Sequence, residues 1–314
     1  MCSVGIILGD DSLKYSFPNH PMNSKRVQSF WEKLKEGGFI DRENIKIVKP
    51  KKASEDVLLL FHTKDHINFV KKASKEGFGA LDRWDTPAYK GVYEASAYSV
   101  GSTILSLEMV MKKEIDHAFN PIGGYHHARK DRSAGFCVFN DVAIAINHAK
   151  KTYGLDRILY VDIDAHHGDG VCYEFFEDPT VFTADIHEDG SYLYPGTGFS
   201  HETGSGEAEG TKLNIGLEPE AGDEEFKEAF IKVEEFSYQV KPELIFFQCG
   251  ADGLSNDPLT HLRYTKEAHR YATEKLHIIS HELCDGRIIA LGGGGYNLNN
   301  VAAAWLEVVK GFMD

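Results

Sequence analysis

The chain has 314 residues, of which 42% are hydrophobic and 26% are charged, and its formal net charge is −14 at pH 7. This length suits one large α/β domain, and we expect residues 1–314 to form a single domain. The acidic balance argues against nucleic acid as a partner, because phosphate contacts require basic patches. An acidic surface attracts cationic ligands or simply keeps a protein soluble.

The cysteines and the first residues predict the compartment. Five cysteines lie far apart, at positions 2, 137, 172, 249 and 284, so we expect no disulfide framework and a reducing cytoplasm. The first ten residues lack the basic and apolar regions of a signal peptide. No apolar run approaches the roughly 20 residues of a membrane span, so we expect no membrane partner. No pattern indicates the oligomeric state.

Apolar, strand-like runs alternate with amphipathic helical stretches along the chain. In chain order, we predict strands at 4–8, 117–119, 158–161, 181–184, 213–215, 244–249 and 288–291. Helices are predicted at about 87–112, 140–151, 223–239 and 265–284. This alternation predicts an α/β fold with a parallel sheet covered on both faces. Polar or glycine-rich clusters follow several of the strands, so we predict one site assembled from several strand ends.

A run of aspartates and histidines at 162–170 follows one of the apolar strands. Because a strand alternates its faces, Asp162, Asp164 and His166 lean to the same side where it ends. A carboxylate and an imidazole two residues apart can bind one metal ion. Mixed nitrogen and oxygen ligands without a thiolate suit zinc or another divalent first-row metal in an open, catalytic site. Asp252, which ends another apolar strand, can supply the third ligand.

Two adjacent histidines and a tyrosine have the chemistry to work beside such a metal. His126 and His127 suit proton transfer, because histidine titrates near neutral pH. Each needs a carboxylate to fix its tautomer, and Asp162 and Asp169 are available. Tyr296 follows four glycines, which allow the backbone to bring the phenol close to the metal. A phenol donor there would stabilise the oxyanion of a tetrahedral intermediate.

Other chemistries have weaker support. The glycines at 292–295 lack the spacing of a phosphate-binding loop, and the chain has no G-x-S-x-G elbow of a serine hydrolase. Cys137 could be a nucleophile beside His127, but a small buried residue is the simpler interpretation. The remaining histidines show no cluster pattern and receive no role: His20, His62, His66, His117, His148, His201, His261, His269, His277 and His281.

Six ordered motifs span nearly the whole chain. They are GGYHHA at 123–128, GFCVFND at 135–141, DIDAHHGDG at 162–170, YPGTG at 194–198, GAD at 250–252 with DPL at 257–259, and LGGGGY at 291–296. Together they resemble the zinc-dependent histone deacetylase superfamily, and the chain is most similar to its prokaryotic acetoin-utilisation-type and deacetylase-like members. The resemblance implies a three-layer α/β/α fold with a central eight-stranded parallel sheet.

The resemblance also implies residue roles. The implied metal ligands are Asp164, His166 and Asp252. The implied catalytic residues are His126 and His127, Asp162 behind His126, Asp169 behind His127, and the oxyanion-stabilising Tyr296. The implied metal is Zn²⁺, with Fe²⁺ as an alternative. In the implied reaction His127 is the general base and then the acid, whereas His126 contributes mainly through its charge.

Substrate residues are implied by the same comparison. Asp85 matches an aspartate at the rim that holds the substrate backbone, and Phe136 and Tyr194 match the aromatic walls of an acyl-lysine tunnel. Leu259 stands where polyamine-specific relatives carry a glutamate, which favours an acetyl-lysine peptide or a neutral small amide. The acidic loop 202–209 argues mildly for a polyamine.

Two positions fit the resemblance less well. Asp185 stands where the superfamily usually has a serine that helps to bind a structural potassium ion; we expect potassium in this chain as well. Arg26 loosely matches the arginine of an internal acetate channel.

Three classes of function therefore compete. The first is a metal-dependent amidohydrolase that removes acetyl groups from lysine in proteins or peptides, or from a small acylated amine such as an acetylpolyamine. An arginase-type manganese hydrolase would carry a carboxylate where this chain has Gly168, and a second aspartate close to Asp252. A binding protein on the same scaffold would typically have lost a metal ligand or the tyrosine, and the chain retains them all.

Overall fold

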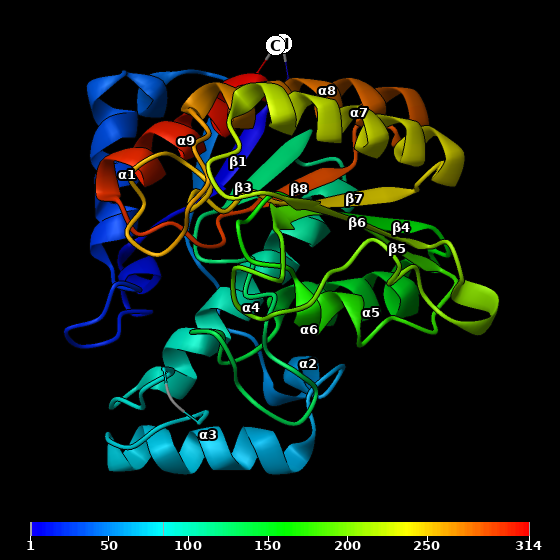
Figure 1. Cartoon of the computed structure of the whole chain (residues 1–314). Coiled ribbons are helices and arrows are strands. Elements are labelled where there is room, and N and C mark those ends of the chain that lie inside the picture. Colours follow the sequence, from blue (N-terminus) through cyan, green and yellow to red (C-terminus); the bar gives the residue numbers. More distant parts are fainter. Residues whose placement is uncertain (1, 84, 314) are drawn as a thin grey trace.

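The computed structural model describes residues 2–83 and 85–313 and shows a central sheet between two layers of helices (Figure 1). The strands are β1 (Val4–Ile7), β2 (Ile45–Val48), β3 (His117–Asn120), β4 (Ile158–Asp162), β5 (Val181–Glu188), β6 (Lys212–Leu217), β7 (Leu244–Gln248) and β8 (Ile288–Leu291). They form one sheet in the order β2-β1-β3-β8-β7-β4-β5-β6, and all neighbouring pairs are parallel. The predicted α/β fold with an eight-stranded parallel sheet is confirmed.

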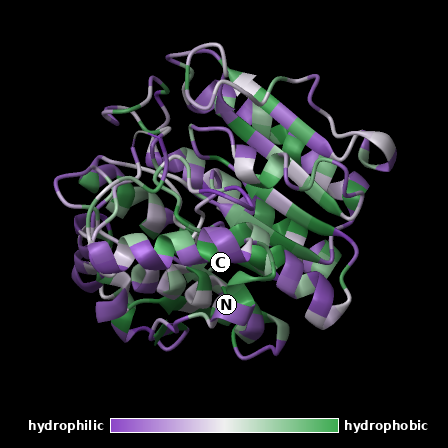
Figure 2. Ribbon diagram, turned by 90° about the horizontal axis from the view of Figure 1, so that it is seen from below, coloured by the Kyte–Doolittle hydropathy of each residue, from purple (hydrophilic) through white to green (hydrophobic). Residues whose placement is uncertain are grey.

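The helices cover both faces of this sheet. They are α1 (Lys25–Glu36), α2 (Glu55–Leu58), α3 (Lys64–Glu76), α4 (Val92–Met111), α5 (Asp141–Tyr153), α6 (Asp169–Cys172), α7 (Asp223–Val240), α8 (Lys266–Cys284) and α9 (Leu298–Gly311). In Figure 1, α7 and α8 lie above the sheet, α1 and α9 lie to its left, and α4, α5 and α6 lie below it. Residues of α1, α7, α8 and α9 pack into the same core. In Figure 2 the central strands are largely hydrophobic, whereas hydrophilic segments are frequent on the surrounding helices and loops.

Strand β4 shows why a sheet of this kind is encoded by continuous apolar runs. Its side chains alternate between two apolar cores: Leu159 and Val161 belong to the core under α7, α8 and α9, and Ile158 and Tyr160 to the core over α4 and α5. All four are essentially fully buried. Since both faces are covered by helices, the strand has no polar face to alternate with. Each fully buried aliphatic side chain contributes about 1.5–3 kcal/mol to stability.

The largest difference from the predicted strands is in β5. The apolar pattern predicts a strand at 181–184, but the observed strand is Val181–Glu188. Asp185, His187 and Glu188 interrupt the apolar pattern, yet all three are buried. Their burial is possible because each has a polar partner: Asp185 pairs with His187, and Glu188 accepts a hydrogen bond from His261.

Other differences have local causes. The helix predicted at 87–112 begins only at Val92, because Gly91 precedes it in a left-handed conformation with φ +94°. The structure adds to the predicted elements β2, α1, α3 and α9. All five cysteines are free. Within the described part of the chain, no helix combines the length and apolarity that crossing a membrane requires.

Candidate active site

Four adjacent strands in the middle of the sheet place the predicted site residues. In spatial order these strands are β3, β8, β7 and β4. Because all are parallel, the segments that follow them meet at one edge of the sheet, which is where α/β proteins bind their ligands. These segments carry the paired histidines, the glycine loop with its tyrosine, Asp252, and the aspartate–histidine run.

The structure brings the three predicted metal ligands together. Asp164, His166 and Asp252 each offer a donor atom, and these atoms lie within 4.8 Å of one another. The Nδ1 of His166 lies 3.1 Å from Oδ1 of Asp164 and 3.0 Å from Oδ2 of Asp252. Both carboxylates are buried. Two oxygens and one nitrogen in this arrangement are suitable ligands for a divalent metal ion with a further open position.

The charges of Asp164, His166 and Asp252 also favour the binding of a cation between them. Burial, with the neighbouring Asp164, raises the pKa of Asp252 to about 7. Burial alone would lower the pKa of an imidazole, but hydrogen bonds to Asp164 and Asp252 outweigh it and raise the pKa of His166 to about 10. Two buried carboxylates this close are costly unless positive charge lies between them. A divalent metal ion would supply that charge in place of the proton on His166.

Further groups hold the ligands in position. The Oδ2 of Asp164 accepts hydrogen bonds from the side-chain amide of Gln248 at 2.8 Å and from the backbone N–H of Gly294 at 2.7 Å. Gly250 leaves the space that Asp164 fills, since a Cβ at this glycine would collide with the carboxylate. Such outer contacts fix the orientation of metal ligands and tune their basicity. Gln248 was not among the predicted site residues; its position at the end of β7 was the only signal.

The paired histidines each bind a buried carboxylate. The Nδ1 of His126 donates to Oδ2 of Asp162 at 2.7 Å, and the Nδ1 of His127 donates to Oδ1 of Asp169 at 2.7 Å. The two imidazole centroids are 4.1 Å apart. With each Nδ1 bound to a carboxylate, Nε2 is the nitrogen through which each ring can exchange a proton with a substrate.

The two histidines have different charge states. Asp162 and Asp164 outweigh the effect of burial and raise the pKa of His126 to about 9. Burial, with the charge of His126, lowers the pKa of His127 to about 4. The carboxylate of Asp169 also accepts a hydrogen bond from Nη2 of Arg129 at 2.9 Å, through the oxygen that does not bind His127. Because the pKa of His127 is low and that of His126 is high, His127 is the ring that can accept a proton at neutral pH.

Tyr296 lies at the end of the glycine-rich loop that follows β8. Two of its glycines have positive φ, +62° at Gly293 and +111° at Gly295, a conformation that other residues rarely adopt. The backbone N–H of Tyr296 donates to Oδ2 of Asp257 at 2.7 Å, which fixes the end of the loop. Burial, followed by the charge of Asp252, raises the pKa of Tyr296 well above its usual value. The phenol therefore stays protonated and is a hydrogen-bond donor.

A pocket of about 230 Å³ leads from the surface to these groups. Its walls are Asp85, His127, Gly135, Phe136, His166, Leu193, Tyr194, Leu259 and Tyr296. All four predicted substrate residues are thus at the pocket, together with predicted catalytic and metal-binding residues. The ring of Phe136 lies edge-on to Tyr296, with centroids 5.8 Å apart, and Tyr194 lies edge-on to His127 at 5.1 Å.

The structure also shows the surroundings of Cys137 and Asp185, two further positions considered in the sequence. Cys137 is buried, and burial raises the pKa of its thiol well above the usual value, which agrees with a packing residue and not a nucleophile. The carboxylate of Asp185 is bonded at both oxygens, by Nδ1 of His187 at 2.6 Å and by the backbone N–H of Gly168 at 2.8 Å.

The sheet and the site together define a class, the proteins with the arginase- and deacetylase-like α/β fold. The profile of the family described as "Histone deacetylase domain" matches residues 20–312. The acetoin utilization protein AcuC of Bacillus subtilis (strain 168) is 41% identical over 303 residues, which cover 92% of this chain and 77% of that protein. A probable deacetylase of Archaeoglobus fulgidus is 34% identical over 299 residues, covering 94% of this chain and 81% of that protein. The crystal structure of the HDA15 HD domain superposes with a TM-score of 0.90 at 25% identity, covering 98% and 88% of the two chains.

The chain therefore belongs to the histone deacetylase family, as its motifs predicted, and it is a hydrolase of the deacetylase type. Acetoin utilization proteins are among its similar relatives, which agrees with the subgroup inferred from the sequence. The family assignment sets aside the arginase-type alternative.

Proposed function

We propose that this protein is a zinc-dependent deacetylase that hydrolyses the acetyl amide of acetyl-lysine in proteins or peptides. The observation that carries the proposal is the pocket between Phe136 and Tyr194, which leads to His127, His166 and Tyr296. Aromatic walls suit the apolar part of an extended lysine side chain. The groups at the inner end are those that amide hydrolysis requires.

Each residue of the site has its own role in the proposed hydrolysis. Asp164, His166 and Asp252 would hold the zinc ion, which supplies polarisation of the amide carbonyl and activation of a water molecule. His127, neutral and held by Asp169, accepts a proton from the attacking water through Nε2. The same ring then donates this proton to the amine that leaves, so that acetate and free lysine are the products.

His126 and Tyr296 act on the charge that develops during this reaction. His126 carries a positive charge that favours the negative intermediate, because Asp162 keeps the ring protonated. The hydroxyl of Tyr296 donates a hydrogen bond to the carbonyl oxygen as it becomes negative. His126 is held by its buried contact with Asp162, and the backbone of Tyr296 is held by its hydrogen bond to Asp257.

The identity of the metal needs its own measurement. Carboxylate and imidazole ligands accept Fe²⁺ as well as Zn²⁺. We expect zinc in protein purified under air, and elemental analysis of protein purified with and without oxygen would reveal iron(II) if the cell supplies it.

The charges around the pocket favour a peptide over a polyamine. Among the described residues that line its mouth, Asp85 is the one with an acidic side chain, and Leu259 lies exposed beside it. The acidic loop 202–209 does not line this pocket. Its first residue, Glu202, accepts a hydrogen bond from the hydroxyl of Tyr173 at 2.6 Å. The pocket lining thus offers a polycation a single carboxylate, with Asp82 next to it at the neighbouring rim, and the same carboxylate of Asp85 can accept backbone N–H groups of a peptide.

The test is a direct comparison of substrates. Hydrolysis of acetyl-lysine peptides and of acetylpolyamines is measured on zinc-reconstituted protein, with His127→Ala as the control. We expect faster turnover of the peptides and its loss in the variant. Faster turnover of acetylpolyamines would replace the proposed substrate, and no turnover of either by zinc-loaded protein would favour another amide or a binding role.

Potassium, partners and compartment remain predictions. Each oxygen of Asp185 accepts one hydrogen bond and keeps a second lone pair, so the carboxylate could still contribute to a potassium site together with other oxygen atoms. Activity in potassium compared with choline buffers tests this ion. We further propose a cytoplasmic enzyme that acts without nucleic acid or membrane partners, in keeping with its acidic charge.

A further inference from the structure

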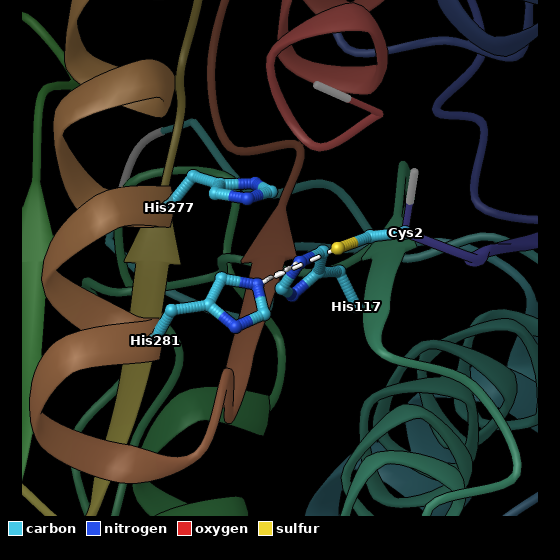
Figure 3. A group of neighbouring side chains, drawn as sticks. All are labelled: Cys2, His117, His277 and His281. Atoms are coloured by element: carbon cyan, nitrogen blue, oxygen red, sulfur yellow. Dashed lines mark hydrogen bonds between the residues drawn. The ribbon is translucent and has the colours of Figure 1, made fainter.

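Figure 3 shows a second group of side chains of metal-ligating types, near the amino-terminal ends of β1 and β3, whereas the active site lies at the carboxyl ends of the strands. It consists of Cys2, which precedes β1, His117, the first residue of β3, and His277 and His281 on α8. Each offers one donor atom, and the four atoms lie within 4.8 Å of one another. The three histidines had no predicted role, because His117, Cys2 and the pair on α8 come from segments far apart in the chain.

The distances suit one metal ion. The Sγ of Cys2 lies 3.5 Å from Nε2 of His281, and this nitrogen lies 3.3 Å from Nε2 of His117. Tetrahedral zinc with bonds of about 2.0–2.3 Å separates its ligand atoms by roughly 3.3–3.8 Å. These two distances thus match two of the six edges of a zinc coordination tetrahedron, and the remaining donor atoms lie within 4.8 Å.

The helix supplies two ligands from one face. His277 and His281 are four residues apart on α8, so their side chains lie one above the other. Their ring centroids are 4.6 Å apart, and those of His277 and His117 are 4.8 Å apart. A pair of histidines at this helical spacing is a recurrent zinc-binding arrangement.

His117 is oriented for coordination. Its Nδ1 lies 3.0 Å from the carbonyl oxygen of Gly286 and donates to it, so the lone pair of the neutral ring is on Nε2, the atom that faces the cluster. A hydrogen bond from the second ring nitrogen to a carbonyl is the usual support of a zinc-bound histidine.

The surrounding backbone fixes the other ligands. The carbonyl oxygen of Cys2 accepts a hydrogen bond from Asn44 at 3.0 Å. The next residue, Ser3, donates through both its backbone N–H and its hydroxyl to Asp116 at 2.7 Å. Gly286 leaves room for the ring of His281, since a Cβ there would lie 2.8 Å from Cε1 of the imidazole. Contacts outside the cluster therefore surround Cys2, His117 and His281.

We propose that Cys2, His117, His277 and His281 bind one zinc-class divalent metal ion. With four protein ligands the site is closed, which is typical of structural and not of catalytic zinc. The ion would tie the segment before β1 and the start of β3 to α8. This site is separate from the active site and does not depend on the proposed substrate.

The first test is the number of ions bound. Metal-free full-length protein is titrated with Zn²⁺ against a chromophoric chelator, and we expect two equivalents. Cys2→Ser and His281→Ala should each bind one equivalent and keep the deacetylase kcat/KM within about twofold, and the two variants check one another if one fails to fold. Cys284→Ser, on the same helix, and His201→Gln should both keep two. A single equivalent in the unchanged protein that both cluster variants retain and His166→Ala loses, or two equivalents in both cluster variants, would overturn the proposal.

Cobalt(II) distinguishes the two sites. The active-site ligands are oxygen and nitrogen atoms, whereas the second site includes a thiolate, so only the second gives sulfur-to-cobalt charge-transfer absorption in the near ultraviolet. We expect this band in the unchanged protein, in Cys284→Ser and in an active-site variant, His166→Ala, and its loss in Cys2→Ser. Its absence from cobalt-loaded unchanged protein would refute thiolate ligation, even if the enzyme is active. Failure of the proposed deacetylase activity would leave this band unaffected.

Discussion

The Nε of Arg26 donates a hydrogen bond to the carbonyl oxygen of Gly295 at 2.6 Å, directly before Tyr296 in the chain. The Nη2 of the same guanidinium donates to the carbonyl oxygens of Gly293 and Gly294, at 2.5 and 2.8 Å. Arg26 is only 3% exposed. One buried side chain on α1 therefore holds three successive carbonyl groups of the loop that positions Tyr296.

This relationship predicts the effect of removing the guanidinium. Arg26→Met leaves three buried carbonyl groups without their donors, so we expect the free energy of unfolding to fall by about 3 kcal/mol. We also expect kcat to fall at least ~10-fold, because the phenol of Tyr296 loses its fixed position. Urea unfolding and steady-state kinetics measure the two effects. Arg42→Met, at an exposed arginine, is the control, and equal behaviour of the two variants would contradict the role of Arg26.

Tyr296→Phe tests the oxyanion donor. Removal of one such donor costs on the order of 10²–10³ in kcat, and we expect a loss in this range with unchanged metal content. Tyr194→Phe removes a hydroxyl from the wall of the same pocket and should change kcat only a few-fold. Near-normal turnover of Tyr296→Phe with bound metal would exclude the proposed role.

Gln248→Ala tests the support of the metal ligands. Loss of the hydrogen bond to Asp164 should weaken metal binding by about 10–100-fold, as is typical of groups that orient a ligand. Competition with a chelator of known affinity gives the dissociation constant, and added metal should restore most of the activity. The matched control is Gln239→Ala, at an exposed glutamine on α7. Unchanged metal affinity in Gln248→Ala would show that the hydrogen bond does not support the metal site.

The buried His62 should make the free energy of unfolding fall at acidic pH. Its Nε2 accepts the backbone N–H of Asn140 at 2.9 Å, and burial, with His66, lowers its pKa to about 3. The unfolded chain binds a proton below its pKa of about 6.5, while the native state does not. The stability from this residue is therefore complete above pH ~6.5 and is lost as the pH falls toward 3, at about 1.4 kcal/mol per pH unit.

Urea unfolding at several pH values measures this dependence. His62→Gln should reduce the slope of unfolding free energy against pH between about pH 6 and pH 4 by the contribution of one proton. His201→Gln, at an exposed histidine, should leave the slope unchanged. If His62→Gln has the same slope as the unchanged protein, this histidine does not remain neutral in the native state.

Leu259→Glu tests what sets substrate preference. The residue is exposed at the pocket mouth, so a carboxylate there gains a solvent-screened ion pair with a cationic substrate. A pair of this kind is worth at most about 1 kcal/mol, so the ratio of acetylpolyamine to peptide kcat/KM should rise up to ~5-fold. Leu259→Gln controls for size and polarity. An equal ratio in both variants would show that charge at this position has no influence.

Sequence patterns predicted the central sheet and the local motifs because these features lie in short stretches. The strand β4 and the run after it are contiguous, so the alternation of a strand is enough to place Asp162, Asp164 and His166 near one another. The edge strand β2 was not predicted; it has four residues, and Lys46 interrupts its apolar pattern. Short edge strands give a weak periodic signal.

Contacts between distant segments could not be predicted in this way. Gln248 reaches Asp164 across 84 positions, and Arg26 reaches the glycine loop across more than 260. The second cluster is the clearest case, since only the spacing of His277 and His281 is visible in the sequence. Its remaining ligands come from other parts of the chain and meet the helix only because the sheet places their strands beside it.

The position of β8 has a consequence for how the protein is made. This strand, Ile288–Leu291, lies between β3 and β7 and is the last of the eight to emerge from the ribosome. Until it is inserted, β2-β1-β3 and β7-β4-β5-β6 share no hydrogen-bonded pair of strands. A chain in which β8 is not yet in place would therefore expose the edges of β3 and β7, and open strand edges are prone to wrong pairing. The same late segment brings Tyr296, so sheet closure and completion of the active site coincide.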